Sequence, residues 1–384
     1  MTTNRGHQVR RSLARAGRIV VKVGSGVLVD GRQRLDTERI GRLVDSMARL
    51  LAEGRQVVLV TSGAVAAGAP VMGLTGSAKT IPQLQACAAV GQNLLMSVYE
   101  RLFSRLGRHT AQVLLTRDDM HNRERYLNAR NTLETLLASA ILPVVNENDT
   151  VAVNEIKFGD NDQLSAQVAV LVQADLLLIL STVGGFYEQI QEGAPEDGRL
   201  ISTVEQITDW HFRHTRDTRN SASITRGGMR SKLLSIRKAA ESGIPSLLVS
   251  GLDARILETA LEGREVGTLF LPFKERLSAR KHWILHSLQP QGRLVVDRGA
   301  ARALTRQGKS LLSIGITAVE GTFHSGNPVR VMGPDGREIA RGLSYYSSRE
   351  VEAIRGCKSE EIRAQLGYSY YDEVIHRDNL VLVK

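Results

Sequence analysis

A lysine inside an apolar run is the first residue of this sequence suited to chemistry. Lys22 interrupts the run Ile19–Val23 and is followed closely by Gly24 and Gly26. Burying a lysine is costly unless it has a partner, and glycines let backbone N–H groups approach a ligand closely. A bound phosphate would explain both features. A lysine on an edge strand followed by an ordinary glycine turn explains them equally well.

A second lysine follows a pair of glycines. Gly227, Gly228 and Met229 precede Lys232, which we expect in the first turn of a helix. Backbone N–H groups at the start of a helix attract anions. The pattern therefore indicates a second lysine at the same phosphate site.

A third glycine-rich turn lies between a predicted strand and a predicted helix. The sequence VTSGAVAAG runs from Val60 to Gly68 and contains Ser62 and Gly63. Ser62 could hold a ligand carboxylate, although a serine that only caps the helix is the more common arrangement. Taken alone, this turn does not decide between the two explanations.

Amides and carboxylates gather in two neighbouring clusters. One is Asn146–Asp149, directly after a predicted strand, and the other is Gly159–Asp162, directly before a predicted helix. Asn and Asp commonly cap helices and form turns, so each cluster alone has a structural explanation. Together they could bind an ammonium group, orient lysines or hold Mg²⁺.

The elements that must position these residues alternate in type along residues 18–275. Short apolar runs without polar alternation are typical of strands buried on both faces of a parallel sheet. In open α/β sheets, ligands bind beyond the carboxyl ends of the strands, where all four clusters fall. The predicted strands are Ile19–Val23, Val57–Val60, Val113–Leu115, Leu142–Val145, Leu176–Leu180 and Ser246–Val249. The predicted helices are Thr37–Glu53, Gln83–Leu106, Ala129–Ser139, Leu164–Val172 and Lys232–Ser242.

The pattern changes after Pro272 to short apolar runs separated by glycine-rich turns, which predicts a small, mainly-β, barrel-like module. Its predicted strands are Leu294–Val296, Leu311–Ile316, Val329–Met332 and Leu380–Val383. We therefore expect a basic, disordered N-terminal extension at 1–17, an α/β domain at 18–275 and the small domain at 285–384.

Composition and charge limit the class of protein. A hydrophobic content of 42% over 384 residues is normal for a globular chain, which excludes wholesale disorder. The only cysteines, Cys87 and Cys357, are far apart, which favours a reducing compartment, and we expect a cytoplasmic protein. Residues 276–384 hold 17 basic and 11 acidic side chains, so the small domain is mildly basic. That charge is compatible with RNA, but a solvated surface explains it more simply.

The motifs together resemble the amino-acid kinase family. The resemblance rests on VVKVGSGVL, VVLVTSGAVAAG, LLTRDDM, YLNARNTLETLL, LPVVNENDTV, IKFGDNDQLSA and GGMRSKL, in this order. The combination of NENDTV with GDND resembles the group of that family that phosphorylates the side-chain carboxylate of glutamate. The C-terminal GRLVVDRGAARALTRQGKSLL is similar to a PUA domain.

The resemblance implies a three-layer sandwich around a mostly parallel sheet, followed by the PUA domain. It implies that ATP phosphorylates L-glutamate to L-glutamyl 5-phosphate, the opening step of proline biosynthesis, with Mg²⁺ present. The implied partners are L-glutamate, further copies of the chain, proline as a feedback inhibitor, and glutamyl-phosphate reductase through functional coupling. For the PUA domain we favour a structural or regulatory role over RNA binding, and we expect no membrane contact.

The resemblance also implies roles for individual residues. Lys22, Lys232 and Asp162 would be catalytic, with Asp162 orienting the lysines. The implied substrate-binding residues are Ser62, Gly63, Asp149 and Asn161. The implied ATP-binding residues are Lys22, Gly24, Ser181, Thr182, Gly227, Gly228, Met229 and Lys232.

Two departures from the family pattern fall on the nucleotide side. Ser181-Thr182 stands where relatives usually have Thr-Asp, and Thr225-Arg226 stands where relatives usually have Gly-Thr, directly before Gly227-Gly228-Met229. The protein itself offers no obvious metal site, since His211 and His214 lack a third ligand nearby.

Three other functions stay open on the sequence alone. One is a family member that acts on aspartate, N-acetylglutamate, carbamate or a nucleoside monophosphate. The second is an RNA-binding or RNA-modifying protein built around the PUA domain, which would leave the lysine and serine loops without a task. The third is an inactive regulatory homologue, against which the intact set of Lys22, Asp162 and Lys232 argues.

Overall fold

The apolar runs predicted as strands form one eight-stranded sheet in the computed structural model, which describes residues 4–32, 34–74, 80–151, 161–188, 198–213, 228–273, 290–369 and 371–383. Six neighbouring strands are parallel, whereas β10 is antiparallel to β9, and β8 pairs parallel with β10. The order across the sheet is β3 (Thr110–Leu115), β4 (Leu142–Glu147), β2 (Gln56–Val60), β1 (Arg18–Val23), β5 (Leu176–Ser181), β9 (Ser246–Ser250), β10 (Thr268–Phe270) and β8 (Thr203–Val204). The predicted mostly parallel sheet is confirmed, and the short strands β8 and β10 are additions that the sequence did not reveal.

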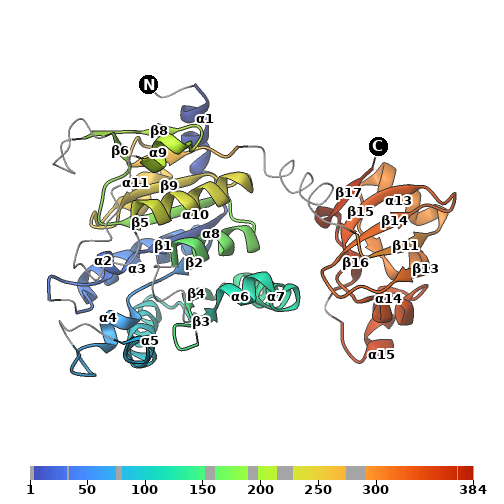
Figure 1. Cartoon of the computed structure of the whole chain (residues 1–384), viewed down its shortest axis with the longest axis horizontal. Coiled ribbons are helices and arrows are strands. Elements are labelled where there is room, and N and C mark those ends of the chain that lie inside the picture. Colours follow the sequence, from blue (N-terminus) through green and yellow to red (C-terminus); the bar gives the residue numbers. More distant parts are fainter. Residues whose placement is uncertain are drawn as a thin grey trace. The chain divides into compact units, whose positions relative to one another are not determined.

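Helices cover both faces of this sheet (Figure 1). The bounds are α1 (Asn4–Leu13), α2 (Ser25–Leu28), α3 (Thr37–Ala52), α4 (Ala64–Gly68), α5 (Ile81–Ser104), α6 (Arg117–His121), α7 (Arg123–Ala138), α8 (Asn161–Leu171), α9 (Asp209–Arg213), α10 (Met229–Glu241) and α11 (Ile256–Leu261). A short hairpin of β6 (Tyr187–Glu188) and β7 (Arg199–Leu200) lies outside the sheet. Among the described helices, none combines the length and the apolar composition that crossing a bilayer requires.

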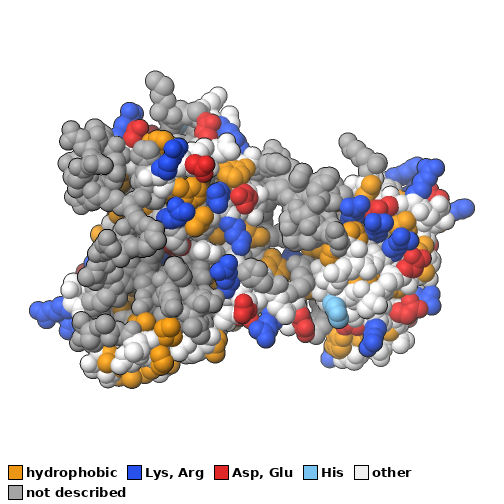
Figure 2. All heavy atoms as spheres, in the orientation of Figure 1, with side chains coloured by type: hydrophobic (Ala, Val, Ile, Leu, Met, Phe, Trp, Pro, Cys, Tyr) orange, Lys and Arg blue, Asp and Glu red, His pale blue; other side chains and the backbone are white. Residues whose placement is uncertain are grey.

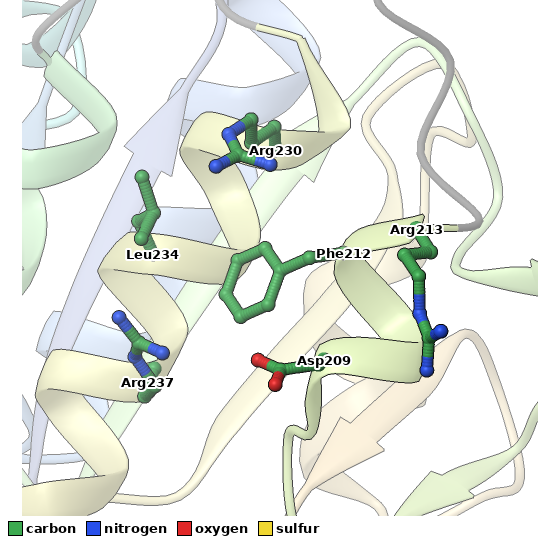
Figure 3. A pocket seen from close by; sticks show the side chains of 6 residues that line it. All are labelled: Asp209, Phe212, Arg213, Arg230, Leu234 and Arg237. Atoms are coloured by element: carbon green, nitrogen blue, oxygen red, sulfur yellow. The ribbon is translucent and has the colours of Figure 1, made fainter.

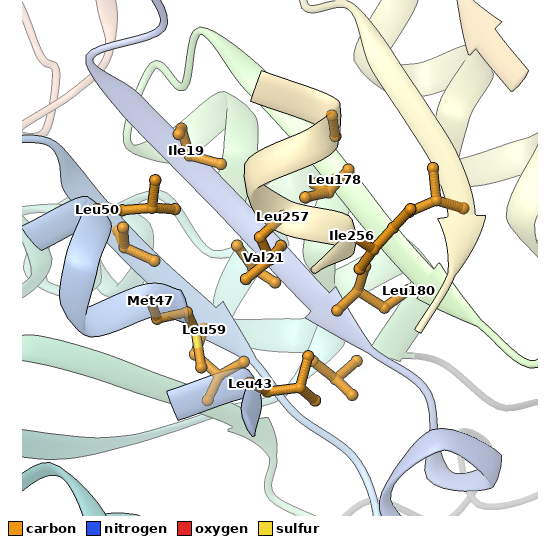
Figure 4. Close-up of a cluster of buried hydrophobic side chains, with 14 of the residues drawn as sticks. Ile19, Val21, Leu43, Met47, Leu50, Leu59, Leu178, Leu180, Ile256 and Leu257 are labelled. Carbon is orange, nitrogen blue, oxygen red and sulfur yellow. The ribbon is translucent and has the colours of Figure 1, made fainter. Parts of the chain in front are cut away.

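Alternation along the central strand divides its side chains between two layers. Ile19 and Val21 of β1 pack with α3 and α11 in a continuous apolar core (Figure 4). Because successive residues of a strand point to opposite faces, Lys22 points to the other face, where α8 packs against β1. The strand thus presents an apolar face to one helical layer and its lysine to the other.

The first 17 residues are not the disordered extension that we predicted. Asn4–Leu13 forms α1, and Arg10 is only 2% exposed. Arg10 donates to the backbone carbonyls of Val266 at 3.0 Å and Arg264 at 3.3 Å, and also to that of Ser202. The basic composition suggested solvation, but here one arginine supplies donors to backbone carbonyls next to the short strands β8 and β10.

Two glycines let α4 pack directly against α5. A methyl group added to Gly68 would lie 1.9 Å from the carbonyl oxygen of Cys87, and one added to Gly91 would lie 1.8 Å from that of Ala64. No side chain fits in so small a space, so the two backbones are in contact. α4 begins directly after Ser62-Gly63, and α5 therefore holds the turn that carries these residues.

The chain divides into two units: Met1–His121 with Asn128–Glu275, and Asn122–Leu127 with Arg276–Lys384. The second unit has a sheet in the order β13 (Ile316–Gly321), β11 (Gly292–Val296), β14 (Pro328–Met332), β15 (Glu338–Leu343) and β17 (Leu380–Leu382), and a pair of β12 (Leu311–Leu312) with β16 (Glu373–Ile375). Its described strand pairs are antiparallel except for β11 with β14. The predicted mainly-β C-terminal domain is confirmed.

Three helices of this unit were not predicted: α13 (Arg298–Gln307), α14 (Ser348–Ile354) and α15 (Ile362–Leu366). The run Leu311–Ile316 is also not one strand, because a 3₁₀ turn at Ser313–Gly315 separates β12 from β13. Our prediction gave too little weight to Ser313 and Gly315, because serine and glycine favour turns over strands. The unit has its own apolar core, in which Tyr345 stacks on Tyr371 with ring centroids 3.8 Å apart.

Candidate functional site

A buried carboxylate joins the two lysines that the sequence singled out. Lys22 lies near the carboxyl end of β1, in register with Val60 of β2 and Ile179 of β5. Its ammonium nitrogen lies 2.5 Å from Oδ1 of Asp162, the second residue of α8. Lys22 is 4% exposed and Asp162 1%. A lysine inside a strand is thus stabilised by a partner from the helix that covers its face.

Lys232 reaches the same carboxylate from the neighbouring helix. It lies in the first turn of α10, which packs beside α8, and is 7% exposed. Its Nζ lies 3.4 Å from Oδ2 of Asp162. Each oxygen of one carboxylate therefore faces one ammonium group, and the cluster holds two cations for one anion.

Burial and the neighbouring charges change the pKa values of Lys22 and Asp162. Burial lowers the pKa of Lys22, the charge of Asp162 partly offsets this effect, and the nearby Lys232 lowers the pKa further. For Asp162, burial alone would raise the pKa, but the two ammonium groups and their hydrogen bonds together lower it below its ordinary value. Asp162 is therefore ionised at neutral pH, and the excess positive charge is available to an anion.

An amide and a hydroxyl meet next to this cluster. Asn161 precedes Asp162 at the start of α8, and its Nδ2 donates to Oγ of Ser62 at 3.1 Å. Ser62 follows β2, and Gly63 takes a left-handed φ of +99° at the start of α4, a conformation that favours glycine. The structure therefore brings Ser62, Gly63 and Asn161 to one edge of the sheet, beside Asp162.

Gly24 corrects one of our expectations. We expected its backbone N–H to be a donor for a ligand, but this group donates to the carbonyl of Leu180 at 3.2 Å. A methyl group added at Gly24 would lie 3.6 Å from Nζ of Lys22. Gly24 thus lies beside the ammonium group, and its N–H is used by the fold.

The other residues assigned to the nucleotide lie at neighbouring positions. Ser181 ends β5 and is buried, and its carbonyl accepts from Gly251, whereas Thr182 is exposed. Gly228 is the N-cap of α10 and Met229 its first residue. Gly227 and Arg226 lie outside the described residues. Because β5 pairs with β1, Ser181 lies at the same sheet edge as Lys22.

Asp149 follows β4 by two residues, in a half-buried turn. The backbone N–H of Asn148 donates to the carbonyl of Leu115, which ties this turn to the neighbouring β3. The turn lies at the carboxyl ends of β3 and β4. Gly159 and Asp160, the first part of the second polar cluster, lie outside the described residues.

Two polar side chains support this edge: Asn146, which we had placed in a polar cluster without a role of its own, and Gln92, which we did not predict. Asn146 of β4 is 1% exposed, and its Oδ1 accepts from Nδ2 of Asn161 at 3.0 Å. Gln92 of α5 is 9% exposed, and its Oε1 accepts from Nδ2 of Asn146 at 2.7 Å. The signal for Gln92 was present, since it falls among the apolar positions of a long helix next to Gly91.

A separate pocket of about 410 Å³ lies between α9 and α10 (Figure 3). The ring of Phe212 lies between two guanidinium groups, 5.6 Å from that of Arg230 and 5.0 Å from that of Arg237. Lys232 is two residues after Arg230, about 200° around the helix. None of the predicted site residues lines this pocket, so it is distinct from the lysine cluster.

Within the described ranges, no group of three or more His, Cys, Asp or Glu side chains is arranged to hold a metal ion. Asp162, the carboxylate at the centre of the cluster, already has both oxygens opposite ammonium groups. The protein side chains described here therefore provide no open set of metal ligands at the lysines.

A mostly parallel α/β sheet with two buried lysines at its carboxyl edge has an excess of positive charge there, which suits an anion such as a phosphate group. A model of the amino acid kinase family matches residues 17–250, and a model of the PUA domain matches residues 292–366. The chain belongs to the amino acid kinase family. It is therefore a kinase, with ATP as the phosphoryl donor.

Curated relatives match almost the whole chain. Glutamate 5-kinase of Geobacter metallireducens is 53% identical over 371 residues, which cover 97% of this chain and 99% of the relative. Glutamate 5-kinase of Geobacter sulfurreducens is 51% identical with the same coverage. That of Caldanaerobacter subterraneus subsp. tengcongensis is 46% identical and covers 96% of this chain and 98% of the relative.

Among solved structures, a carbamate kinase from Giardia lamblia bound to AMP-PNP is similar at 15% identity with a TM-score of 0.48. It covers 67% of this chain and 99% of its own. A UMP kinase from Bacillus anthracis is similar at 13% identity with a TM-score of 0.45 and covers 67% of this chain and 97% of its own. Similarities of this degree carry no argument about function.

Proposed function

We propose that this chain transfers the γ-phosphoryl group of ATP to the side-chain carboxylate of L-glutamate, the opening step of proline biosynthesis. The observation that carries the proposal is the buried Asp162 with an ammonium group on each oxygen, beside the Ser62–Asn161 pair. The relatives that match nearly the full length are named glutamate 5-kinases, which supports glutamate as the acceptor.

The reaction needs no general base. The side-chain carboxyl of glutamate has an ordinary pKa of about 4.3 and is already ionised at neutral pH. One of its oxygens attacks the γ-phosphorus of ATP, the bond from that phosphorus to the β–γ bridging oxygen breaks, and ADP leaves with the electron pair. The products are L-glutamyl 5-phosphate and ADP, and no proton is transferred.

The main requirement is then to reduce the repulsion between two anions. Lys22 contacts the phosphates of ATP, and Lys232 stabilises the phosphoryl group as it moves. Asp162 holds both lysines but neutralises only one charge, so a net positive charge remains. This arrangement supplies positioning and charge, which are what phosphoryl transfer mainly asks of a protein.

The remaining residues divide between the two substrates. Ser62, Gly63, Asn161 and Asp149 bind glutamate, with the carboxylate of Asp149 opposite the α-ammonium group. Gly24, Ser181, Thr182, Gly227, Gly228 and Met229 surround the nucleotide. Lys22 and Lys232 lie between the glutamate-binding and the nucleotide-binding residues and interact with the phosphoryl group that is transferred.

Mg²⁺ fits this site only as an ion that ATP carries. The described carboxylate at the lysines has both oxygens paired, so phosphate oxygens and water would be the ligands of the ion. When bound, it supplies further positive charge to the phosphates. Lys22, Lys232 and Asp162 orient the reacting groups in either case.

A hydroxamate assay tests the donor, the acceptor and the product together. The purified chain is incubated with ATP, Mg²⁺, hydroxylamine and either glutamate, aspartate or N-acetylglutamate. We expect an acyl hydroxamate with glutamate, because hydroxylamine traps an acyl phosphate. ADP release with another acceptor and none with glutamate would overturn the proposal.

We further propose that the protein acts in the cytoplasm as a homo-oligomer, is inhibited by proline, and is functionally coupled to glutamyl-phosphate reductase. The support is the full-length similarity to glutamate 5-kinases. Acyl phosphates hydrolyse readily, which makes rapid consumption of the product useful. Light scattering tests the oligomeric state, and activity assays with added proline test inhibition. Transfer of the product in the presence of the reductase tests functional coupling.

For the PUA domain we propose a structural or regulatory role, with RNA binding as the second candidate. Figure 2 shows basic side chains of the second unit interspersed with acidic ones on the visible face. Such a mixture favours solvation over binding of a phosphate backbone. A salt-sensitive gel shift of RNA by the full chain would favour RNA binding instead.

A further inference from the structure

Four side chains from four segments form a continuous hydrogen-bonded chain at the carboxyl edge of the sheet. Gln92 of α5 accepts from Asn146 of β4, and Asn146 accepts from Asn161 of α8. Asn161 in turn donates to Ser62 after β2. The chain therefore links the long helix α5 to two residues that we propose as glutamate ligands.

One backbone N–H group determines which atom donates and which accepts at each link of this hydrogen-bonded row of side chains. The N–H of Glu147 donates to the side chain of Asn146 at 2.9 Å. A backbone N–H can only donate, so the atom of Asn146 that faces it must be Oδ1. Asn161 must then present its Nδ2 to that oxygen, whichever way its amide would otherwise be placed.

With the donors and acceptors arranged in this way, the side-chain oxygen of Asn161 has no role within the row of hydrogen bonds. Its Nδ2 donates to both Asn146 and Ser62, which uses both N–H bonds of the amide. Its Oδ1 is buried and has no hydrogen-bond partner among the residues that the structure describes. A buried carbonyl oxygen without a donor is unfavourable, and such groups are usually completed by a ligand or water.

Gln92 holds the other end of the chain. Its Oε1 is the acceptor for Nδ2 of Asn146, which would otherwise be a buried donor without this partner. The backbone at Gln92 is held in place, because its neighbour Gly91 lies against the backbone of α4. Two turns further on, the hydroxyl of Tyr99 lies 2.9 Å from Oγ1 of Thr61, the residue before Ser62.

We propose that Gln92 is a positioning residue that makes the site selective for an α-amino acid. By holding Asn146, it keeps Oδ1 of Asn161 directed to the α-ammonium group of glutamate. A dicarboxylic acid without an amino group, such as glutarate, makes no use of this oxygen. The inference rests on the proposed function, since it assigns one atom of the glutamate site.

The test compares glutamate with glutarate in the variant Gln92→Met, which keeps the volume and removes the acceptor. We expect the KM for glutamate to rise about tenfold, the effect of losing one well-placed hydrogen bond to a charged group. We expect kcat, the KM for ATP and the inhibition constant of glutarate as a competitor of glutamate to change less than about threefold.

Two matched variants serve as controls. Gln92→Glu keeps an oxygen that can accept from Asn146 and should retain the KM for glutamate within about threefold. Asn93→Met changes the next residue of α5, which is exposed, and should leave every constant unchanged. Asn146→Leu breaks the chain at its next link and should reproduce Gln92→Met, and the double variant should add nothing further.

The ratio of the glutamate KM to the glutarate inhibition constant tests the proposed role of Gln92. Both constants describe the same folded protein, so a general weakening of the site would change them together. A rise in this ratio supports the proposal. An unchanged ratio, with both constants weakened or neither, means that Gln92 only supports packing. If Gln92→Met does not fold, the same ratio is measured for Asn146→Leu and interpreted in the same way. A wild-type chain inactive with glutamate would instead disprove the proposed function.

Discussion

The ammonium group of Lys22 lies 2.5 Å from Oδ1 of Asp162, and both side chains are almost completely buried. Burying one ion pair is costly and not in itself a source of stability. Here Lys232 adds a second cation to the same carboxylate. An excess of buried positive charge makes sense if an anion joins it during function.

Lys232→Met should remove transition-state stabilisation while preserving the fold. We expect kcat to fall about 10²-fold or more, as for the loss of one preorganised donor at a developing charge. The thermal midpoint should change little, because methionine fills the volume and one buried cation is removed. Lys238→Met, an exposed position of the same helix, is the control. Near-normal turnover of the Lys232 variant would exclude it from catalysis.

The pH profile should report the lowered pKa of Lys22. Lys22 must be protonated to attract phosphate, so kcat/KM for ATP should decline on the alkaline side at a lower pH than the ordinary lysine value of about 10.4 predicts. Asp162→Asn removes the charge that raises this pKa, so the decline should move to still lower pH. An alkaline limb at the same pH in both proteins would contradict the coupling.

Asp162 should also make stability depend on pH on the acid side. Its pKa is lowered in the folded state, so its contribution to the free energy of unfolding is complete above the unfolded pKa of about 3.9. That contribution is lost as the pH falls through the lower folded value. Urea unfolding should show a difference between wild type and Asp162→Asn that shrinks with acidification over this range. A difference independent of pH would be inconsistent with the ionised carboxylate.

Gly91→Ala should disturb the contact between α4 and α5. The added methyl group would lie 1.8 Å from the carbonyl oxygen of Ala64, so one backbone must move, at a cost of about 1–3 kcal/mol. Because α4 follows Ser62, the KM for glutamate should rise as well. Gly41→Ala is the control, since its added methyl group meets nothing within 4 Å and should stabilise α3 by about 0.5–1 kcal/mol. Equal unfolding midpoints for the two variants would refute the close contact.

Arg10→Met should show that α1 is part of the fold. The carbonyl of Val266 would lose its side-chain donor and that of Arg264 would keep only the N–H of Val266, which should lower the free energy of unfolding by about 1–3 kcal/mol. Arg11→Met, on the exposed side of α1, should change it by less than about 0.5 kcal/mol. Urea unfolding followed by circular dichroism compares the two. A similarly small effect of both variants would mean that the Arg10 contacts of α1 do not contribute to the free energy of unfolding.

Much of the parallel sheet could be predicted from the sequence because buried strands leave unbroken apolar runs. The run Leu176–Leu180 became β5, and Lys22 was conspicuous because a charge is unusual in such a run. The short strands β8 and β10 could not be found in this way. Each has only two or three residues, too few to show a period, and their pairing depends on the sheet already being formed.

The sequence by itself determined which residue types could do chemistry: two lysines, a serine turn and two clusters of amides and carboxylates, placed at strand ends by the alternation of strand and helix. The family resemblance implied that Asp162 orients the lysines, but only the tertiary structure showed that each of its oxygens faces one lysine and that Gln92 supports Asn161. Hydrophobic periodicity reports which face of an element is buried, because burial is a local preference of each side chain. Which buried polar groups meet depends on how α5, α8 and α10 pack, and that packing is a property of the whole core.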